Sequence, residues 1–230
     1  MCAMKSKRLL EVCAGNMASV EAAVQAGAER IELCRALDVD GLTPRLDVLQ
    51  QVKERFPRLT VHVLIRPREG DFVYSAGEVN AMVAAIEAAL PWADGVVCGA
   101  LTADGEVDVA AMRLLLAAAR GKPFTFHRAY DVCRHPFKAL DEIVALGCDR
   151  LLTSGQQATA MQGIPLLRQL RQQAGDRLVV MPGGGVNASN AGHIVDATGC
   201  HEIHGSCSAG TGITQADEVR RVLDVLARNR

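Results

Sequence analysis

The sequence predicts a single (β/α)8 barrel. Short apolar, β-branched runs alternate with longer Ala/Leu-rich segments of helical period, and there are eight such pairs. Strict alternation favours parallel strands with crossover helices, and eight units close a barrel. A length of 230 residues suits one α/β barrel domain. An open doubly wound sheet is the alternative, but no Gly-x-Gly-x-x-Gly pattern follows the first expected strand.

Capping and first-turn residues mark the first two expected helices. Asn16 is a good N-cap and Gly27 a good C-cap for the first helix, and Pro44 suits the first turn of the second. The expected strands cover residues 8–13, 30–34, 60–66 and 95–99, and the helices cover 16–26, a segment from 43 onward, 75–90 and 108–120.

The last four units follow the same rhythm, with Gly147 ending the fifth helix. The expected strands cover residues 124–128, 150–154, 178–181 and 202–206, and the helices cover 136–146, 159–173, a segment from 188 onward and 215–227. Because no linker or shift in composition interrupts the chain, we expect one domain over residues 1–230.

Composition argues against two classes of partner. A net charge of −1 gives no broad attraction for nucleic acid or anionic membranes, and an aromatic content of 3% leaves few stacking platforms. We find no signal-peptide pattern at the N-terminus and no apolar stretch long enough to span a bilayer. Eight scattered cysteines without a CxxC pair predict reduced thiols in a cytoplasmic protein. The oligomeric state stays open, and a homo-oligomer is compatible with the sequence.

Alternation along the strands predicts a polar barrel interior. Apolar residues of one parity should face the helices, leaving the opposite parity in the lumen. The lumen set comprises Glu11 and Cys13, Glu32 and Cys34, His62 and Arg66, Thr125 and His127, and Glu202 and His204. Such a lumen is stable only if its charges pair. Glu11 and Glu32 could therefore belong to a purely structural network, whereas Arg66 and His127, at strand ends, favour a functional site.

Loops that follow the strands extend this set. Arg66, Arg68 and Asp71 lie in one loop, and His127, Arg128 and Asp131 lie in another. Arginines suit bidentate binding of carboxylate or phosphate, and His127 with Asp131 or Glu32 could transfer protons. The alternative for Arg68 and Asp71 is a pair that only shapes the loop.

A glycine run follows the seventh expected strand. Gly183, Gly184 and Gly185 precede a helix, so their backbone N–H groups could bind an anion where barrels often hold phosphate. The run could equally serve only to make a tight turn.

Cys13 and Cys34 end two neighbouring strands. Adjacent strands lie about 4.8 Å apart, so the two sulfurs could hold a soft Cu(I) ion in two-fold coordination. The alternative is that both are small apolar residues that fill gaps in the core.

Several segments together resemble the CutC family. They are, in family order, Leu10-Glu-Val-Cys-Ala, Arg30-Ile-Glu-Leu-Cys, Gly41-Leu-Thr-Pro, Ile65-Arg-Pro-Arg-Glu-Gly-Asp-Phe-Val-Tyr-Ser, Phe124-Thr-Phe-His-Arg-Ala-Tyr-Asp, Leu151-Leu-Thr-Ser-Gly and Met181-Pro-Gly-Gly-Gly. The resemblance covers about residues 8–208 and implies a cytoplasmic barrel associated by name with copper homeostasis. It departs from the family at Glu69, where a glycine is usual, and after Ser208, where a longer stretch is usual.

The resemblance implies that Cys13 and Cys34 are the Cu(I) ligands. The other positions that match the family look more like an enzyme pocket: Glu11, Glu32, His62, Arg66, Arg68, Asp71, His127, Arg128, Asp131 and Ser154. Three hypotheses follow: copper handling, a barrel enzyme acting on a small anionic or phosphorylated metabolite, or a polar lumen that only stabilises the fold.

Overall fold

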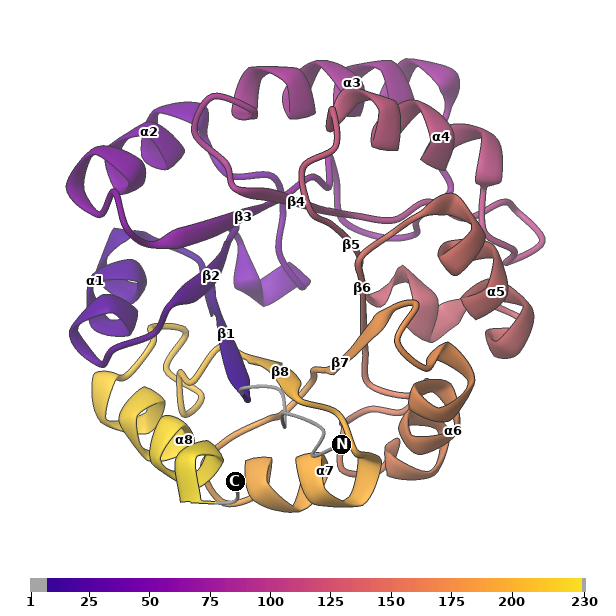
Figure 1. Ribbon diagram of the computed structural model, residues 1–230. Helices are drawn as coiled ribbons and strands as arrows, with labels where there is room; N and C mark the ends of the chain where they lie inside the picture. Colours follow the sequence, from indigo (N-terminus) through magenta and orange to yellow (C-terminus); the bar gives the residue numbers. More distant parts are fainter. Residues whose placement is uncertain (1–7, 229–230) are drawn as a thin grey trace.

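Eight parallel strands form a ring inside a second ring of helices (Figure 1). The computed structural model describes residues 8–228, so Cys2 lies outside the described residues. The strands are β1 (Leu9–Ala14), β2 (Arg30–Leu33), β3 (Thr60–Leu64), β4 (Gly95–Cys98), β5 (Phe124–Phe126), β6 (Arg150–Thr153), β7 (Val179–Pro182) and β8 (Glu202–Gly205). The predicted (β/α)8 barrel is confirmed.

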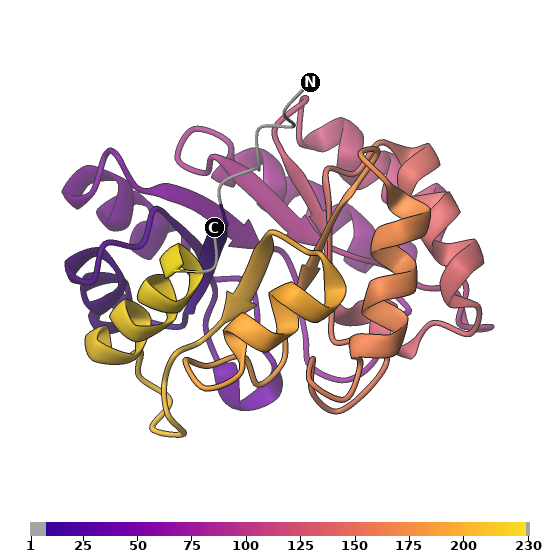
Figure 2. The same cartoon turned by 60° about the horizontal axis from the view of Figure 1, so that its bottom comes forward.

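Hydrogen bonding runs from β7 back through the chain to β1 and then to β8. This order brings β7 and β8 side by side, so that the barrel is nearly closed (Figures 1 and 2). Glu11 lies opposite Arg30 on one side and His204 on the other, which places three lumen positions at one level.

The helices alternate with the strands. They are α1 (Met17–Gln25), α2 (Leu46–Arg55), α3 (Ala76–Ala89), α4 (Val109–Ala118), α5 (Pro136–Leu146), α6 (Ile164–Ala174), α7 (Ala191–Thr198) and α8 (Ala216–Arg228), with short 3-10 turns η1 (Leu37–Val39) and η2 (Arg128–Val132). The expected caps are present: the Asn16 side chain accepts from the Ser19 amide, and Gly147 ends α5 with a left-handed backbone. None of the described helices is both long and apolar enough to cross a membrane.

Three helices begin later than predicted because tertiary contacts hold the preceding residues. Thr43 exchanges backbone and side-chain hydrogen bonds with Arg66 at the end of β3. The amide of Ala160 donates to the carbonyl of Gly184, and that of Ala188 donates to the Glu218 carboxylate. These amides lie before α6 and α7, so both helices start further along the chain.

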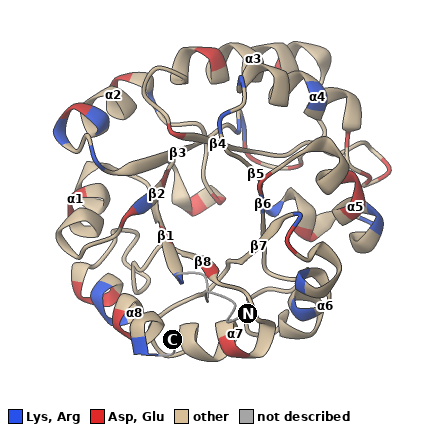
Figure 3. Cartoon of the chain, viewed as in Figure 1, with Lys and Arg blue, Asp and Glu red and all other residues tan. Residues whose placement is uncertain are grey.

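Burial separates an apolar layer from a polar lumen. Leu10 and Val12 belong to the core beneath the helices, whereas Glu11, between them in sequence, faces the lumen and has 0% exposure. Colouring by charge shows that most Lys, Arg, Asp and Glu residues lie on the outer helices and loops (Figure 3). The few charges inside the barrel are therefore exceptions that each need a partner.

Candidate metal and ligand site

A buried carboxylate anchors the amino-terminal half of the lumen. Glu11 Oε2 lies 2.7 Å from Arg30 Nε and 3.0 Å from His62 Nδ1, and Glu11 Oε1 lies 3.0 Å from His204 Nδ1. Burial alone would raise the pKa of Glu11. Hydrogen bonds from the two histidines and the charge of Arg30 outweigh burial and hold its pKa well below the ordinary 4.5.

A second carboxylate continues this network. Glu202 forms ion pairs with Arg30 and with Arg150, the latter at 2.9 Å between Nε and Oε2. We call Glu11, Arg30, His62, Arg150 and Glu202 the floor of the lumen. Every charge of the floor has an opposite partner, as a buried network requires.

The two predicted thiol ligands lie just above the floor. Cys13 Sγ is 3.7 Å from Cys34 Sγ, and both side chains are buried. The two cysteines lie at different levels of the barrel, because Cys13 lies opposite Glu32 and Cys34 follows the last residue of β2. The sulfurs still meet because both side chains have the lumen-facing parity. The hydrogen bond with Cys34, together with burial, raises the pKa of Cys13 well above its ordinary value.

A cavity of about 340 Å³ opens at the carboxyl ends of the strands. Its lining comprises Cys13, Glu32, Leu37, Asp40, Leu64, Arg66, Phe72, His127, Arg128, Asp131, Val132, Leu152, Gly184, Gly185, Val186, His204, Gly205 and Ser206. We call four buried side chains of this lining, Cys13, Glu32, His127 and His204, the mouth. Polar groups converging in a concave site of this size are typical of a ligand pocket.

His127 presents an unused donor to the cavity. Its Nδ1 accepts from the Ala129 amide at 3.2 Å, and its ring packs edge-on against Phe72. Burial and the nearby Arg66 guanidinium lower the pKa of His127 to about 3, so the ring is neutral and carries its proton on Nε2. Nε2 is buried and has no partner among residues 8–228.

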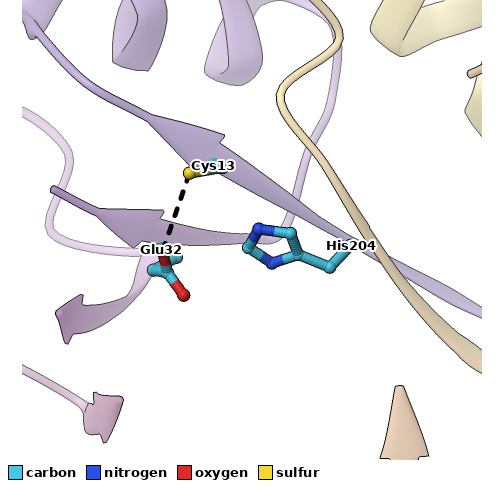
Figure 4. Close-up of side chains that lie close together, drawn as sticks. All are labelled: Cys13, Glu32 and His204. Atoms are coloured by element: carbon cyan, nitrogen blue, oxygen red, sulfur yellow. Dashed lines mark hydrogen bonds between the residues drawn. The ribbon is translucent and has the colours of Figure 1, made fainter. Parts of the chain in front are cut away.

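Glu32 presents an unused oxygen beside His204. Cys13 Sγ donates to Glu32 Oε1 at 3.6 Å, while Glu32 Oε2 is buried without a partner in the described chain. Burial raises the pKa of Glu32. Burial would lower the pKa of His204, but the charge of Glu32 and hydrogen bonds to Cys13 and Glu11 raise it well above 6.5. In Figure 4 the imidazole lies beside Cys13 and Glu32.

The guanidinium of Arg66 is hydrogen-bonded to backbone carbonyls. Its guanidinium donates to the carbonyls of Val39, Gly41 and Gly70 at 2.7–3.1 Å, and it lies over the Phe72 ring. Although Arg66 lines the cavity, these bonds make it a clamp that joins two loops.

Arg68 and Asp71 form an ion pair that shapes the loop, which was the alternative to a role in ligand binding. Arg68 Nη2 donates to Asp71 Oδ1 at 2.9 Å, and Arg68 Nε pairs with Glu78. Both residues lie outside the cavity lining. The loop therefore contributes Phe72 to the cavity, while Arg68 and Asp71 hold the loop in shape.

Asp131 is surrounded by donors. It accepts hydrogen bonds from Arg128 Nε at 2.8 Å and from Thr153 Oγ1. The backbone amide and the hydroxyl of Ser154 and the backbone amide of Gln156 also donate to it. These bonds occupy both oxygens, so Asp131 positions Arg128 at the cavity edge. Arg128 Nη2 also donates to Ser154 Oγ at 3.3 Å.

The glycine run allows β7 to approach its neighbours. A Cβ on Gly183 would lie 2.5 Å from Leu152 Cδ1 and 3.3 Å from His204 Cβ. Gly184 has a φ of +100°, and a Cβ there would lie 3.7 Å from Arg128 Cζ. A side chain on Gly183 would displace Leu152 of the cavity wall, whereas one on Gly184 would be strained by the positive φ.

The structure brings most of the predicted residues together at one end of the barrel. Glu11 and His62 lie in the floor beneath the cavity, and Ser154 reaches it through Arg128. His204 joins the site although only its strand parity signalled it, because its pairing with Glu11 depends on the register of β1 and β8. Arg30 has the same strand parity as Glu32 but was not predicted, because parity alone does not show that its guanidinium lies beside Glu11.

A (β/α)8 barrel with its polar site at the carboxyl ends of the strands defines the general class of this protein. The CutC family model matches residues 8–209, and the chain belongs to the CutC family. A protein named CutC from Chromobacterium violaceum is 49% identical over 200 residues, covering 86% of this chain and 81% of that protein. One from Glaesserella parasuis is 43% identical over 228 residues, covering 94% and 93%.

Solved structures agree with this assignment. A structure solved under the name of copper homeostasis protein CutC, from Streptococcus agalactiae, has a TM-score of 0.83 and 35% identity, covering 86% of this chain and 98% of that one. A KDPGal structure has a TM-score of 0.65 at 15% identity, covering 97% of each chain, which shows a shared fold alone.

Proposed function

We propose that the protein binds Cu(I) through the thiolates of Cys13 and Cys34. The observation that supports this most directly is the 3.7 Å separation of their sulfurs. Two thiolates suit a soft, low-coordinate ion such as Cu(I). Cys13 lines the cavity, which gives the ion a route from solvent to the buried pair.

The cellular role that fits this chemistry is copper homeostasis in the cytoplasm. The name of the related Streptococcus agalactiae structure includes copper homeostasis. The seven cysteines of the described chain are all free thiols, which is typical of a reducing compartment.

Anaerobic Cu(I) titration tests the proposal. Wild type should bind one ion per chain, and a Cys13→Ser/Cys34→Ser double variant should lose this binding. Cys200→Ala is a matched control, because Cys200 is buried outside the cavity lining. Binding must displace thiol protons, so the apparent affinity of wild type should increase with pH. Equal affinity of wild type and the double variant would contradict the proposal.

A second candidate is an enzyme that acts on a small anionic or phosphorylated metabolite. The observation that favours it is the pair of unpartnered buried atoms, His127 Nε2 and Glu32 Oε2, facing a cavity of ligand size. His127 and Glu32 would exchange protons with the metabolite. Arg128 would bind its anionic group beside the backbone of Gly184 and Gly185, with Asp131 and Ser154 holding the guanidinium.

A thermal-shift screen of carboxylate and sugar-phosphate metabolites tests this candidate. At least one should raise the Tm of wild type, and His127→Asn should reduce that rise, since Asn can replace Nδ1 but not Nε2. If none of the screened anions stabilises wild type, the second candidate fails while the Cu(I) proposal stands.

A further inference from the structure

Three donor atoms of different chemistry converge at the mouth. A sulfur of Cys13, a carboxylate oxygen of Glu32 and an imidazole nitrogen of His204 all lie within 4.8 Å of one another (Figure 4). The three side chains come from β1, β2 and β8, which are consecutive in the sheet. We propose that Cys13, Glu32 and His204 bind a divalent ion of the Zn²⁺ type, with one coordination position open to the cavity.

His204 is oriented as a metal-binding histidine is. Its Nδ1 is paired with Glu11 Oε1 at 3.0 Å, so Nε2 is the nitrogen that can bind the ion, which must displace the proton from it. Carboxylates commonly hold the second nitrogen of a ligating histidine in this way, fixing the ring and its tautomer. Glu11 is itself fixed by Arg30 and His62, so the orientation of the ring depends on the rigid floor.

Glu32 supplies an independent indication of a ligand. Its side chain is 4% exposed, and its buried Oε2 has no partner among the described residues. A buried carboxylate oxygen without a donor is rare unless a ligand or ion completes it. The adjacent Cys13, only 3.6 Å from the other oxygen, supplies the thiolate.

The open position follows from the cavity. Cys13, Glu32 and His204 all contribute to its lining. Three protein ligands with a fourth position left open characterise catalytic zinc sites, whereas structural zinc sites have four protein ligands. An ion here would offer that position to a carbonyl or anionic oxygen of a small molecule in the cavity.

This divalent site goes beyond the proposed Cu(I) site and differs from it in donor set. Cys13 is common to both, Cys34 belongs only to the Cu(I) pair, and Glu32 and His204 belong only to the divalent site. Mixed nitrogen, oxygen and sulfur donors suit Zn²⁺, whereas a pair of thiolates suits Cu(I). Because Cys13 cannot serve both ions fully, the two metals should compete.

Titration of the whole protein with Zn²⁺, and with Co²⁺ as a spectroscopic probe, tests the inference. Wild type should bind one ion per chain, and the Co²⁺ spectrum should show a charge-transfer band for a single thiolate in a four-coordinate site. Glu32→Gln and His204→Gln should each lower Zn²⁺ affinity by more than about tenfold, the lower bound for losing even an outer-shell partner. Glu69→Gln is the matched control, because Glu69 is exposed.

Cys34→Ser separates the two metal sites. It should weaken Cu(I) binding and leave Zn²⁺ affinity within about twofold of wild type, far below the tenfold effect expected for a lost ligand. Failure of wild type to bind Zn²⁺ or Co²⁺, or a Co²⁺ spectrum of two thiolates, would overturn the divalent site and leave the Cu(I) proposal intact. The wild-type spectrum gives this result even if a variant does not fold.

Discussion

The floor and the mouth of the lumen contain similar residues but differ in how they are satisfied. In the floor, Glu11, Arg30 and Glu202 pair with one another and with neighbouring side chains. In the mouth, Glu32 Oε2 and His127 Nε2 are also buried, yet neither forms a hydrogen bond or an ion pair within the described chain.

This contrast separates a stabilising network from a site that requires a ligand. Buried charges are tolerated when they are paired, so the floor can hold the strands together without any ligand. A buried polar atom without a partner destabilises the folded protein unless a bound group satisfies it. We therefore expect the floor to contribute stability and propose that the mouth binds a ligand.

The largest change in the free energy of unfolding is expected for a substitution in the floor. Glu11→Leu removes the carboxylate that Arg30, His62 and His204 share and leaves Arg30 with Glu202 as its remaining partner. We expect the free energy of unfolding to fall by about 3–5 kcal/mol, the usual result of breaking a buried ion pair. Urea denaturation measures the change, with exposed Asp47→Asn as control. A loss below about 1 kcal/mol, the range of surface pairs, would remove the distinction between floor and mouth.

Arg66 should behave as a structural clamp although it lines the cavity. Arg66→Ala deprives the carbonyls of Val39, Gly41 and Gly70 of a donor. We expect a loss of about 2–3 kcal/mol, from partly buried acceptors left unsatisfied. Arg66→Lys keeps the charge but not the forked donors, so it should recover only part of the stability in chemical denaturation. Full recovery by lysine would show that charge alone matters there.

His127 should make stability depend on pH. The pKa of His127 is about 3 in the folded protein and about 6.5 in an unfolded chain, so between these values only the unfolded chain takes up the proton. His127 should therefore lower the stability by about 2 kcal/mol as pH drops from 7 to 5, and the raised pKa of His204 acts in the opposite direction over this range.

A variant comparison isolates that contribution. His127→Asn should flatten the pH profile of the unfolding free energy between pH 7 and 5, whereas His193→Gln, at an exposed position of α7, should leave the wild-type slope. An unchanged slope in His127→Asn would mean that the pKa of His127 is the same in the folded protein and in the unfolded chain, which would contradict the lowered pKa.

The smallest effect is expected outside both regions. Arg68→Ala breaks partly exposed pairs with Asp71 and Glu78. The decrease in Tm should be small and should disappear at high salt, which screens such pairs. A decrease that persists at high salt would indicate that Arg68 supports the cavity through packing.

The alternation of strands with helices was enough to predict the barrel, and the alternation of side chains along each strand was enough to predict its polar lumen. Parity placed Glu11, Glu32 and His127 inside because successive strand residues point to opposite faces. It could not predict which carboxylate is satisfied, since that depends on register: Glu11 lies opposite Arg30, whereas Glu32 lies opposite Cys13. The helix starts were missed for a similar reason, because long-range bonds such as that between Thr43 and Arg66 override local helix propensity.

The most direct test of the contrast is a crystal structure of the protein loaded with Cu(I) under anaerobic conditions, with anomalous scattering recorded at the copper edge. We predict a single copper peak between the sulfurs of Cys13 and Cys34, with the floor pairs around Glu11 unchanged. A copper peak elsewhere, or none in fully loaded crystals, would contradict the assignment of metal binding to this end of the barrel.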